Sequence, residues 1–91
     1  MSWYVYIVRC RDNTLYCGIT KSVEKRVHEH NTSKKGAKYT RGRRPVTLVW
    51  WREVHEIRMA CSLECEIKSM PKKDKERMVK ENLDCPYQES K

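Results

Sequence analysis

The stretch Tyr16-Cys17-Gly18-Ile19-Thr20 runs directly into a segment, Ser22 to Asn31, whose pattern is helical. Within that segment one helix face should carry the residues at i, i+3, i+4 and i+7, which are Val23, Arg26, Val27 and His30. Two of these are apolar, as expected for a face that packs on a core, and the other two are a guanidinium and an imidazole. The pattern therefore predicts a helix whose inner face holds a permanent positive charge and a proton-transfer group.

The composition is that of one small basic globular domain. Its 91 residues include 20 Lys and Arg against 12 Asp and Glu, a formal net charge of +8, which attracts nucleic acid first and anionic membrane surfaces second. No apolar run approaches the roughly 20 residues of a membrane span, and no secretion signal opens the chain. We expect a cytoplasmic, nuclear or nucleoid-associated protein, not secreted and without a membrane partner, with one domain over 1–84 and a flexible tail over 85–91.

The five cysteines include no Cys-x-x-Cys pair, and an odd number without a secretion signal argues against a disulfide framework. Cys61 and Cys65 stand at i, i+4 and could share a zinc ion with His55. The simpler interpretation treats these cysteines as small hydrophobic residues in a reducing compartment.

Two strand-forming runs, Trp3 to Cys10 and Leu15 to Thr20, predict a hairpin. The length of its turn decides which side chains meet, because a one-residue slip moves every side chain of a strand to the other face. A two-residue turn would pair Tyr6 with Ile19. A three-residue turn with Asn13 in the left-handed region would instead pair Tyr6 with Gly18 and Val8 with Tyr16.

The remaining elements follow from periodicity and capping signals. Ser22 is the expected N-cap of the first helix, whose solvent face should hold Glu24, Lys25, His28 and Glu29. A third strand is predicted over Val46 to Val54, a second helix over Ile57 to Met70 and a third over Lys72 to Leu83. In the second helix Glu64 leans toward the inner stripe, whereas Glu66 and Lys68 face out. The order β-β-α-β-α-α predicts an α+β fold, a three-stranded antiparallel sheet flanked by helices.

A loop is predicted between the first helix and the third strand, over Thr32 to Pro45. It holds an aromatic residue, Tyr39, and six cations with no acidic residue: Lys34, Lys35, Lys38, Arg41, Arg43 and Arg44. Such a segment can contact phosphates and stack on a base. The alternative is a solvated basic loop without a ligand.

Several ionisable groups should lie where a core is expected: Arg26 and His30 on the first helix and Glu64 on the second, with Tyr6 and Tyr16 from the hairpin. Each has a structural explanation, such as a buried ion pair or a hydrogen-bonded tyrosine tip. Together they form an inventory suited to cleaving a phosphodiester with one divalent metal.

These residues resemble the motifs of the GIY-YIG nuclease superfamily: Tyr4-Val5-Tyr6, then Tyr16-Cys17-Gly18, then Arg26 and His30, then Ala60-x-x-x-Glu64-x-x-Ile67-Lys68. The run Gly36 to Pro45 resembles the loop of the small stand-alone members. Two departures are Tyr4 in place of the first motif's glycine and Cys17 in the middle of the second motif. The resemblance implies a three-stranded antiparallel sheet, and it favours the three-residue turn because both motif tyrosines border the family's active site.

By this resemblance the catalytic residues are Tyr6, Tyr16, Arg26, His30 and Glu64, with Gly18 structural at the site. Glu64 would hold Mg²⁺ or Mn²⁺, Arg26 would bind the phosphate, and Tyr6 would take the proton from the attacking water. The expected function is a metal-dependent endonuclease acting on nucleic acid, DNA rather than RNA, in repair or recombination. The alternatives are a nucleic-acid-binding module that does not cut and, further behind, a structural or interaction protein. The oligomeric state is left open.

Overall fold

The computed structural model describes residues 2–32 and 38–81. Its elements are β1 (Trp3–Arg9), β2 (Leu15–Thr20), α1 (Val23–Thr32), α2 (Lys38–Arg41), β3 (Thr47–Val54), α3 (Ile57–Ser69) and α4 (Lys72–Glu81). The strands form one antiparallel sheet in the order β2-β1-β3, so β1 is central. This confirms the predicted α+β class and the three-stranded antiparallel sheet.

The β1–β2 hairpin has the three-residue turn. Tyr6 lies opposite Gly18 and Val8 opposite Tyr16, and Asn13 has a φ of 70°, the left-handed conformation that asparagine tolerates. Cys10 N–H donates to the Thr14 carbonyl at 2.8 Å and closes the turn. Tyr6 and Tyr16 therefore face the same side of the sheet.

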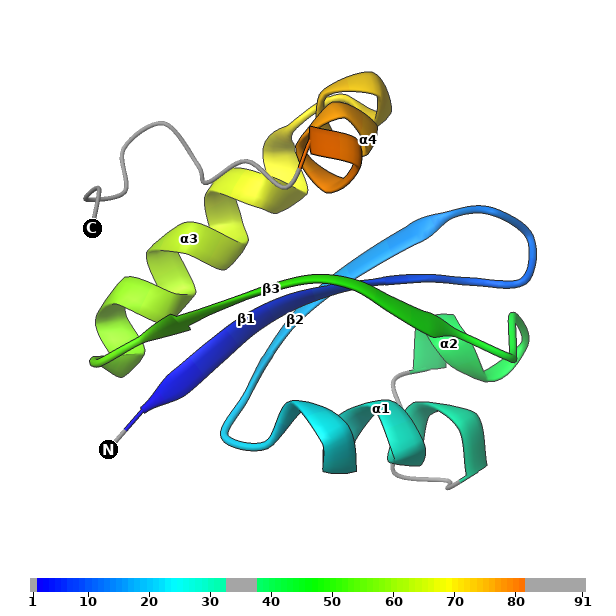
Figure 1. Cartoon of the computed structure of the whole chain (residues 1–91), viewed down its shortest axis with the longest axis horizontal. Helices are drawn as coiled ribbons and strands as arrows, with labels where there is room; N and C mark the ends of the chain where they lie inside the picture. The colour runs from blue at the N-terminus through cyan, green and yellow to red at the C-terminus, as the bar shows by residue number, and fades with distance from the viewer. Residues whose placement is uncertain (1, 33–37, 82–91) are drawn as a thin grey trace.

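Helices cover both faces of the sheet, with α3 and α4 on one side and α1 and α2 on the other (Figure 1). The larger core lies under α3 and α4, where Val5, Ile7 and Trp50 meet Leu63 and Ile67. The smaller core, on the α1 side, contains Tyr6, Val8, Cys10 and Val46. Both faces of β1 are buried, because successive side chains of this apolar strand point to opposite faces and helices cover each of them.

The predicted helices are present, and the predicted loop over 32–45 is wrong in part. Ser22 caps α1 as expected, since its Oγ accepts the Lys25 N–H at 3.4 Å. Thr32 belongs to α1, and residues 38–41 form the short helix α2. A four-residue helix is too short to show a helical period in sequence, which is why periodicity missed it. Lys34, Lys35 and the proposed tail at 85–91 lie outside the described residues.

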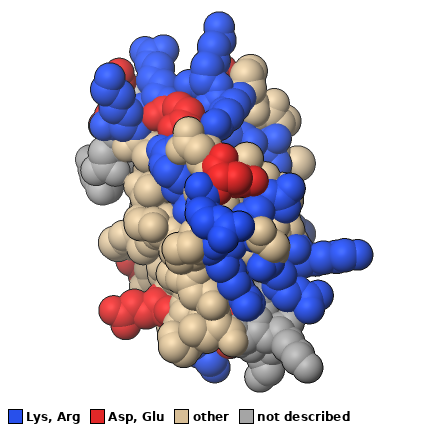
Figure 2. All heavy atoms as spheres, turned by 90° about the vertical axis from the view of Figure 1, so that its right-hand side faces the viewer, with Lys and Arg blue, Asp and Glu red and all other residues tan. Residues whose placement is uncertain are grey.

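The hairpin turn touches the elements on both sides of the sheet. Arg9 makes two hydrogen bonds to the Glu76 carboxylate, of 2.8 and 2.7 Å, and the Lys72 ammonium donates to the Asn13 carbonyl at 2.9 Å, so α4 is attached to the hairpin. From the other side, Arg11 N–H donates to the Arg43 carbonyl at 2.9 Å. Lys and Arg dominate the face of the molecule at this end (Figure 2). Among the described helices, none is long and apolar enough to cross a membrane.

Candidate active site

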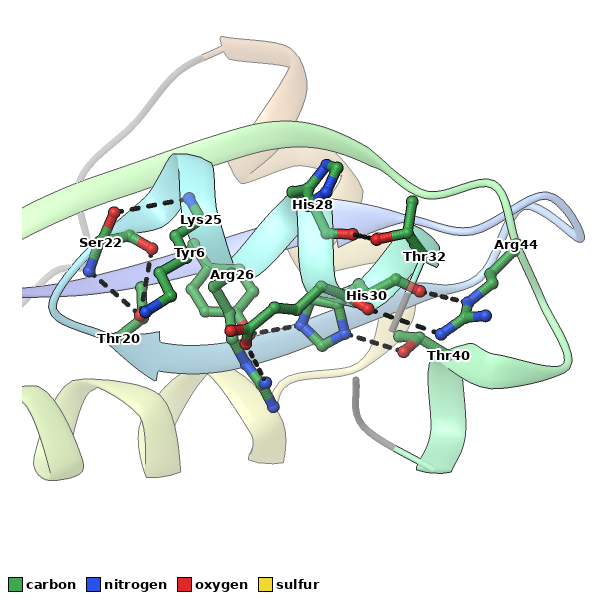
Figure 3. Close-up of polar contacts among 11 residues, drawn as sticks. Tyr6, Thr20, Ser22, Lys25, Arg26, His28, His30, Thr32, Thr40 and Arg44 are labelled. Atoms are coloured by element: carbon green, nitrogen blue, oxygen red, sulfur yellow. Dashed lines mark hydrogen bonds and ion pairs between the residues drawn. The ribbon is translucent and has the colours of Figure 1, made fainter. Parts of the chain in front are cut away.

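The centre of the candidate site is a buried chain of hydrogen bonds that joins three elements. Tyr6 Oη of β1 lies 2.7 Å from His30 Nε2 of α1, and His30 Nδ1 lies 2.8 Å from Thr40 Oγ1 of α2. The imidazole lies between the other two side chains (Figure 3). All three residues are almost completely buried, with exposed fractions of 1%, 0% and 0%.

Burial favours the neutral forms of the two ionisable groups in this chain. It raises the pKa of Tyr6 to about 12, although a hydrogen bond with Arg26 acts in the opposite direction. Burial also lowers the pKa of His30 to about 4, and the positive charge of Arg26 adds to that effect. At neutral pH His30 is thus an uncharged imidazole with one donor nitrogen and one acceptor nitrogen.

The hydrogen bond with Arg26 gives the chain a direction. A guanidinium only donates, so the Tyr6 oxygen accepts from Arg26 and its own proton points toward His30 Nε2. His30 then carries its proton on Nδ1 and donates to Thr40 Oγ1. The order of donation is Arg26 to Tyr6, Tyr6 to His30, and His30 to Thr40.

Gly18 provides the space for the Tyr6 hydroxyl. A Cβ built on Gly18 would lie 2.5 Å from Tyr6 Oη and 2.8 Å from Cζ, distances that real Cβ atoms essentially never show. The second motif therefore needs glycine opposite Tyr6, where the facing ring packs directly on the backbone.

Arg26 is half-buried between the inner and outer sides of α1. Its Nη1 donates to Glu29 Oε1 at 2.9 Å, one turn later in the same helix. The prediction that Glu29 belongs to the solvent face is wrong, since Glu29 is half-buried and holds Arg26. Glu29 and Tyr6 together fix the guanidinium from two sides.

Tyr16 connects this chain of contacts to α3. Its ring meets the His30 ring edge-on at a centroid distance of 5.5 Å. The Lys68 ammonium lies 5.8 Å from the Tyr16 ring centroid and forms an ion pair with Glu64 Oε2 at 3.3 Å. Because β2 is an edge strand, residues of α3 can reach around it toward side chains on the α1 side.

Glu64 is half-buried, with 22% of its side chain exposed, and its carboxylate pairs with Lys68 one turn later in α3. Contacts through Lys68, Tyr16 and His30 thus connect the five predicted catalytic residues across four elements. Lys68 was expected to face out; it is exposed, yet it lies at the junction between Glu64 and Tyr16.

The predicted nucleic-acid-binding segment borders the site through Tyr39. The rings of Tyr39 and Tyr16 stack at 5.6 Å and 25°, and the Arg43 guanidinium lies 4.0 Å from the centroid of Tyr39. Arg43 also donates to Asp12 at 3.0 Å and to the Tyr39 carbonyl at 2.7 Å. Lys38 and Arg41 are exposed.

Arg44 has a structural partner at the end of α1. Its Nε donates to the His30 carbonyl, and its Nη2 lies 3.5 Å from the Glu29 carbonyl. A cation at the carboxyl end of a helix satisfies free carbonyls and complements the helix dipole. The Arg44 guanidinium therefore already has backbone partners in the protein itself, without a bound phosphate.

Sequence reasoning missed Thr40, which is fully buried and completes the hydrogen bonding of His30. A threonine inside a basic stretch carries no periodic signal, so only the fold could reveal it.

For the zinc alternative, the described part of the chain holds no cluster of three or more His, Cys, Asp or Glu side chains that could bind a metal. Cys61 and Cys65 are both exposed on α3.

The fold, the opposed Tyr6–Gly18 pair, the Arg26 bonded to Tyr6 and the Glu64 linked through Lys68 to Tyr16 together define a GIY-YIG domain. The family model for the GIY-YIG catalytic domain matches residues 2–78, and the chain belongs to this family.

Among its relatives, the chain is 47% identical over 79 residues to the UPF0213 protein of Syntrophus aciditrophicus, covering 87% of this chain and 91% of that one. It is 49% identical over 81 residues to the UPF0213 protein of Haloquadratum walsbyi, covering 89% and 90%. The solution NMR structure of the UPF0213 protein of Bacillus halodurans matches with 41% identity and a TM-score of 0.57, over 88% of this chain and 84% of that one. The chain is therefore similar in extent to small single-domain proteins.

Proposed function

We propose that this protein is a divalent-metal-dependent endonuclease that hydrolyses phosphodiester bonds in nucleic acid, DNA rather than RNA. Membership of the GIY-YIG family supports a nuclease-type function. The observation that carries the proposal for this chain is the hydrogen-bonded set around Tyr6, which holds Arg26 in place. The carboxylate of Glu64 is linked to this set through Lys68, whose ammonium lies beside the Tyr16 ring. DNA repair or recombination is the proposed setting.

In this proposal Arg26 binds the scissile phosphate. The guanidinium offers a planar fork of donors that suits phosphate oxygens, and its contacts with Glu29 and Tyr6 hold it in position. Positive charge held in place before the reaction stabilises the charge that develops on the phosphate in the transition state.

The geometry changes the role expected for Tyr6. A residue that is 1% exposed and whose pKa is raised to about 12 is poorly suited to take a proton from water at neutral pH. We therefore assign Tyr6 to positioning Arg26 with the support of His30. Tyr16 is half-buried and nearer the Glu64–Lys68 pair, so we place its side chain beside the attacking water.

Glu64 is the residue we propose to hold Mg²⁺ or Mn²⁺. A single half-buried carboxylate that is partly open to solvent fits the binding mode of Mg²⁺, which keeps several waters and often uses one or two carboxylates together with substrate phosphates. When bound, the ion would supply positive charge to the scissile phosphate and to the leaving oxygen. The Lys68 ammonium lies 3.3 Å from Glu64 Oε2, so a metal ion at this carboxylate would compete with Lys68 for it.

The basic segment would position the strand through phosphate contacts that do not depend on sequence. Lys38 and Arg41 are exposed for this role, and Tyr39 is 38% exposed beside Tyr16. Arg43 and Arg44 can contribute charge while keeping their structural partners. Lys34 and Lys35 are included in the proposal from the sequence alone.

The proposal is tested with labelled single-stranded, duplex and branched DNA and with RNA, each incubated with wild-type protein and Mg²⁺ or Mn²⁺. We expect cleavage of at least one DNA substrate, its loss with EDTA, and its loss in Arg26→Ala with binding largely retained. Binding without cleavage under all these conditions would instead favour the second candidate, a non-catalytic nucleic-acid-binding module, which the exposed cations beside Tyr39 would equally support.

A further inference from the structure

The β1–β2 turn joins two groups of cations that are far apart in sequence. Arg11 N–H donates to the Arg43 carbonyl on one side of the turn, and Lys72 donates to the Asn13 carbonyl on the other. The turn thus lies between the segment after α2 and the first turn of α4. We call the cations gathered here the turn surface: Arg9, Arg11, Arg41, Arg43 and Lys72.

The carboxylates of this surface are already neutralised by internal partners. Asp12 receives hydrogen bonds from Thr14 and Arg43, which lower the pKa of its carboxyl. Glu76 accepts hydrogen bonds from Nη1 and Nη2 of Arg9, and that interaction also lowers the pKa of its carboxyl. Both acids are therefore ionised and paired at neutral pH. Against these two negative charges stand the five cations of the turn surface, an excess of three positive charges.

Arg11 shows the excess most clearly. It is exposed at the tip of the hairpin, and its side chain makes no ion pair with any residue in the described ranges 2–32 and 38–81. Arg41, the last residue of α2, is exposed as well. Figure 2 shows many Lys and Arg side chains on this end of the molecule, more than Asp and Glu, with uncharged surface between them.

The turn surface is continuous with the candidate site through a row of stacked and bonded side chains. From Glu64 the row passes through Lys68, Tyr16, Tyr39 and Arg43, and it ends at Asp12 in the turn. Tyr39, with the Arg43 guanidinium 4.0 Å from its ring centroid, therefore lies between the candidate site and the turn, where a polyanion that leaves the site would meet it.

We propose that the turn surface is a second phosphate-binding region, which holds the nucleic-acid backbone on the hairpin side of the site, with Arg11 and Arg41 as direct phosphate contacts. The proposal rests on the proposed function for the identity of the polyanion. It extends the binding surface beyond the basic segment to the hairpin tip and to the start of α4. Paired cations such as Arg43 and Arg9 would mainly keep the turn in place.

The test is the salt dependence of binding, measured by fluorescence anisotropy with a labelled oligonucleotide and EDTA so that no cleavage occurs. The variant is the double substitution Arg11→Gln with Arg41→Gln, which removes two exposed cations. The matched control is Lys21→Gln with Arg58→Gln, two exposed cations at the opposite end of the sheet. Circular dichroism and thermal unfolding establish that both variants fold.

Removing one cation that binds a phosphate reduces the slope of log K against log salt concentration by roughly 0.7 to 0.9. We expect the slope of the Arg11/Arg41 variant to fall by about 1.5 and the control to keep the wild-type slope. A fall of only about 0.8 is what Arg41 of the basic segment would give alone, and it would overturn the role of Arg11 at the hairpin tip. Equal slopes in all three proteins would overturn the proposal. Binding to phosphatidylserine vesicles is measured in parallel. If the variant keeps its oligonucleotide binding but no longer binds the vesicles, the turn surface binds lipid phosphate and the proposal is overturned. Because EDTA removes divalent metal, the outcome is independent of whether the protein cleaves.

Discussion

The hydroxyl of Tyr6 lies so close to Gly18 that a Cβ at position 18 would come within 2.5 Å of it. This close approach sets the position of Tyr6 Oη, and through it those of Arg26 and His30. The glycine of the second motif is thus a steric requirement of the first motif's tyrosine.

Gly18→Ala should displace the Tyr6 ring and destabilise the protein by about 1 to 3 kcal/mol, the usual cost of overpacking a buried site. Urea unfolding measures the decrease, and Gly42→Ala is the matched control because a Cβ there meets nothing within 4 Å. Adding Tyr6→Phe to Gly18→Ala should recover part of the stability. Equal stabilities of the two alanine variants would contradict the steric account.

Stability should fall as the pH is lowered from about 6.5 to 4. The unfolded chain binds a proton to His30 near its ordinary pKa of 6.5, whereas the folded protein does so only near 4. In that window the unfolded state therefore holds more protons, and acid favours unfolding by up to about 3 kcal/mol. Unfolding free energies at pH 7.5, 6.0 and 5.0 test this, above the range where the carboxyls of Asp12 and Glu76 take up protons. A constant stability over these three values would refute the assignment of a neutral buried imidazole.

Thr40 should control the tautomer of His30. Thr40→Val removes the acceptor for Nδ1–H and leaves a buried donor without a partner, at a cost of about 1 to 3 kcal/mol. Thr40→Ser keeps the hydroxyl and should restore most of the stability. The ¹⁵N chemical shifts of His30 should show a protonated Nδ1 in the wild type and in Thr40→Ser. A proton on Nε2 in the wild type would contradict the order of donation from Arg26 to Thr40.

Lys68 should compete with divalent metal for Glu64, because its ammonium lies 3.3 Å from Oε2. Lys68→Met should tighten Mn²⁺ binding, up to about fivefold for an exposed ion pair, as followed by electron paramagnetic resonance of free Mn²⁺. Lys80→Met on α4 is the control. If both variants bind Mn²⁺ as the wild type does, Glu64 is not the metal ligand or Lys68 does not occupy its site.

Much of this structure follows from local sequence signals. The strand pattern predicts the hairpin, and the spacing from Val23 to His30 predicts the polar stripe of α1, because both depend on neighbouring residues. The register of the hairpin is predicted only with the family resemblance, which favours the three-residue turn that the structure has. Site features that depend on contacts between distant elements could not be predicted in this way. Thr40 reaches His30 only because α2 packs on α1, and Lys68 reaches Tyr16 only because β2 is an edge strand.

Burial is the other quantity that the sequence left open. An imidazole and a tyrosine on an inner face can border either water or protein, and the two cases imply different chemistry. Here the pair is buried, which supports the positioning role that we propose for Tyr6 and our proposal that Tyr16 lies beside the attacking water.

The central claim is that Glu64 carries the metal-dependent cleavage of nucleic acid, and single-turnover cleavage by Glu64→Gln tests it most directly. Glu66→Gln is the matched control, a half-buried carboxylate on the same helix. We predict that Glu64→Gln loses Mn²⁺-dependent cleavage while it binds the oligonucleotide and unfolds like the wild type, and that Glu66→Gln cleaves normally. Undiminished cleavage by Glu64→Gln would contradict the account.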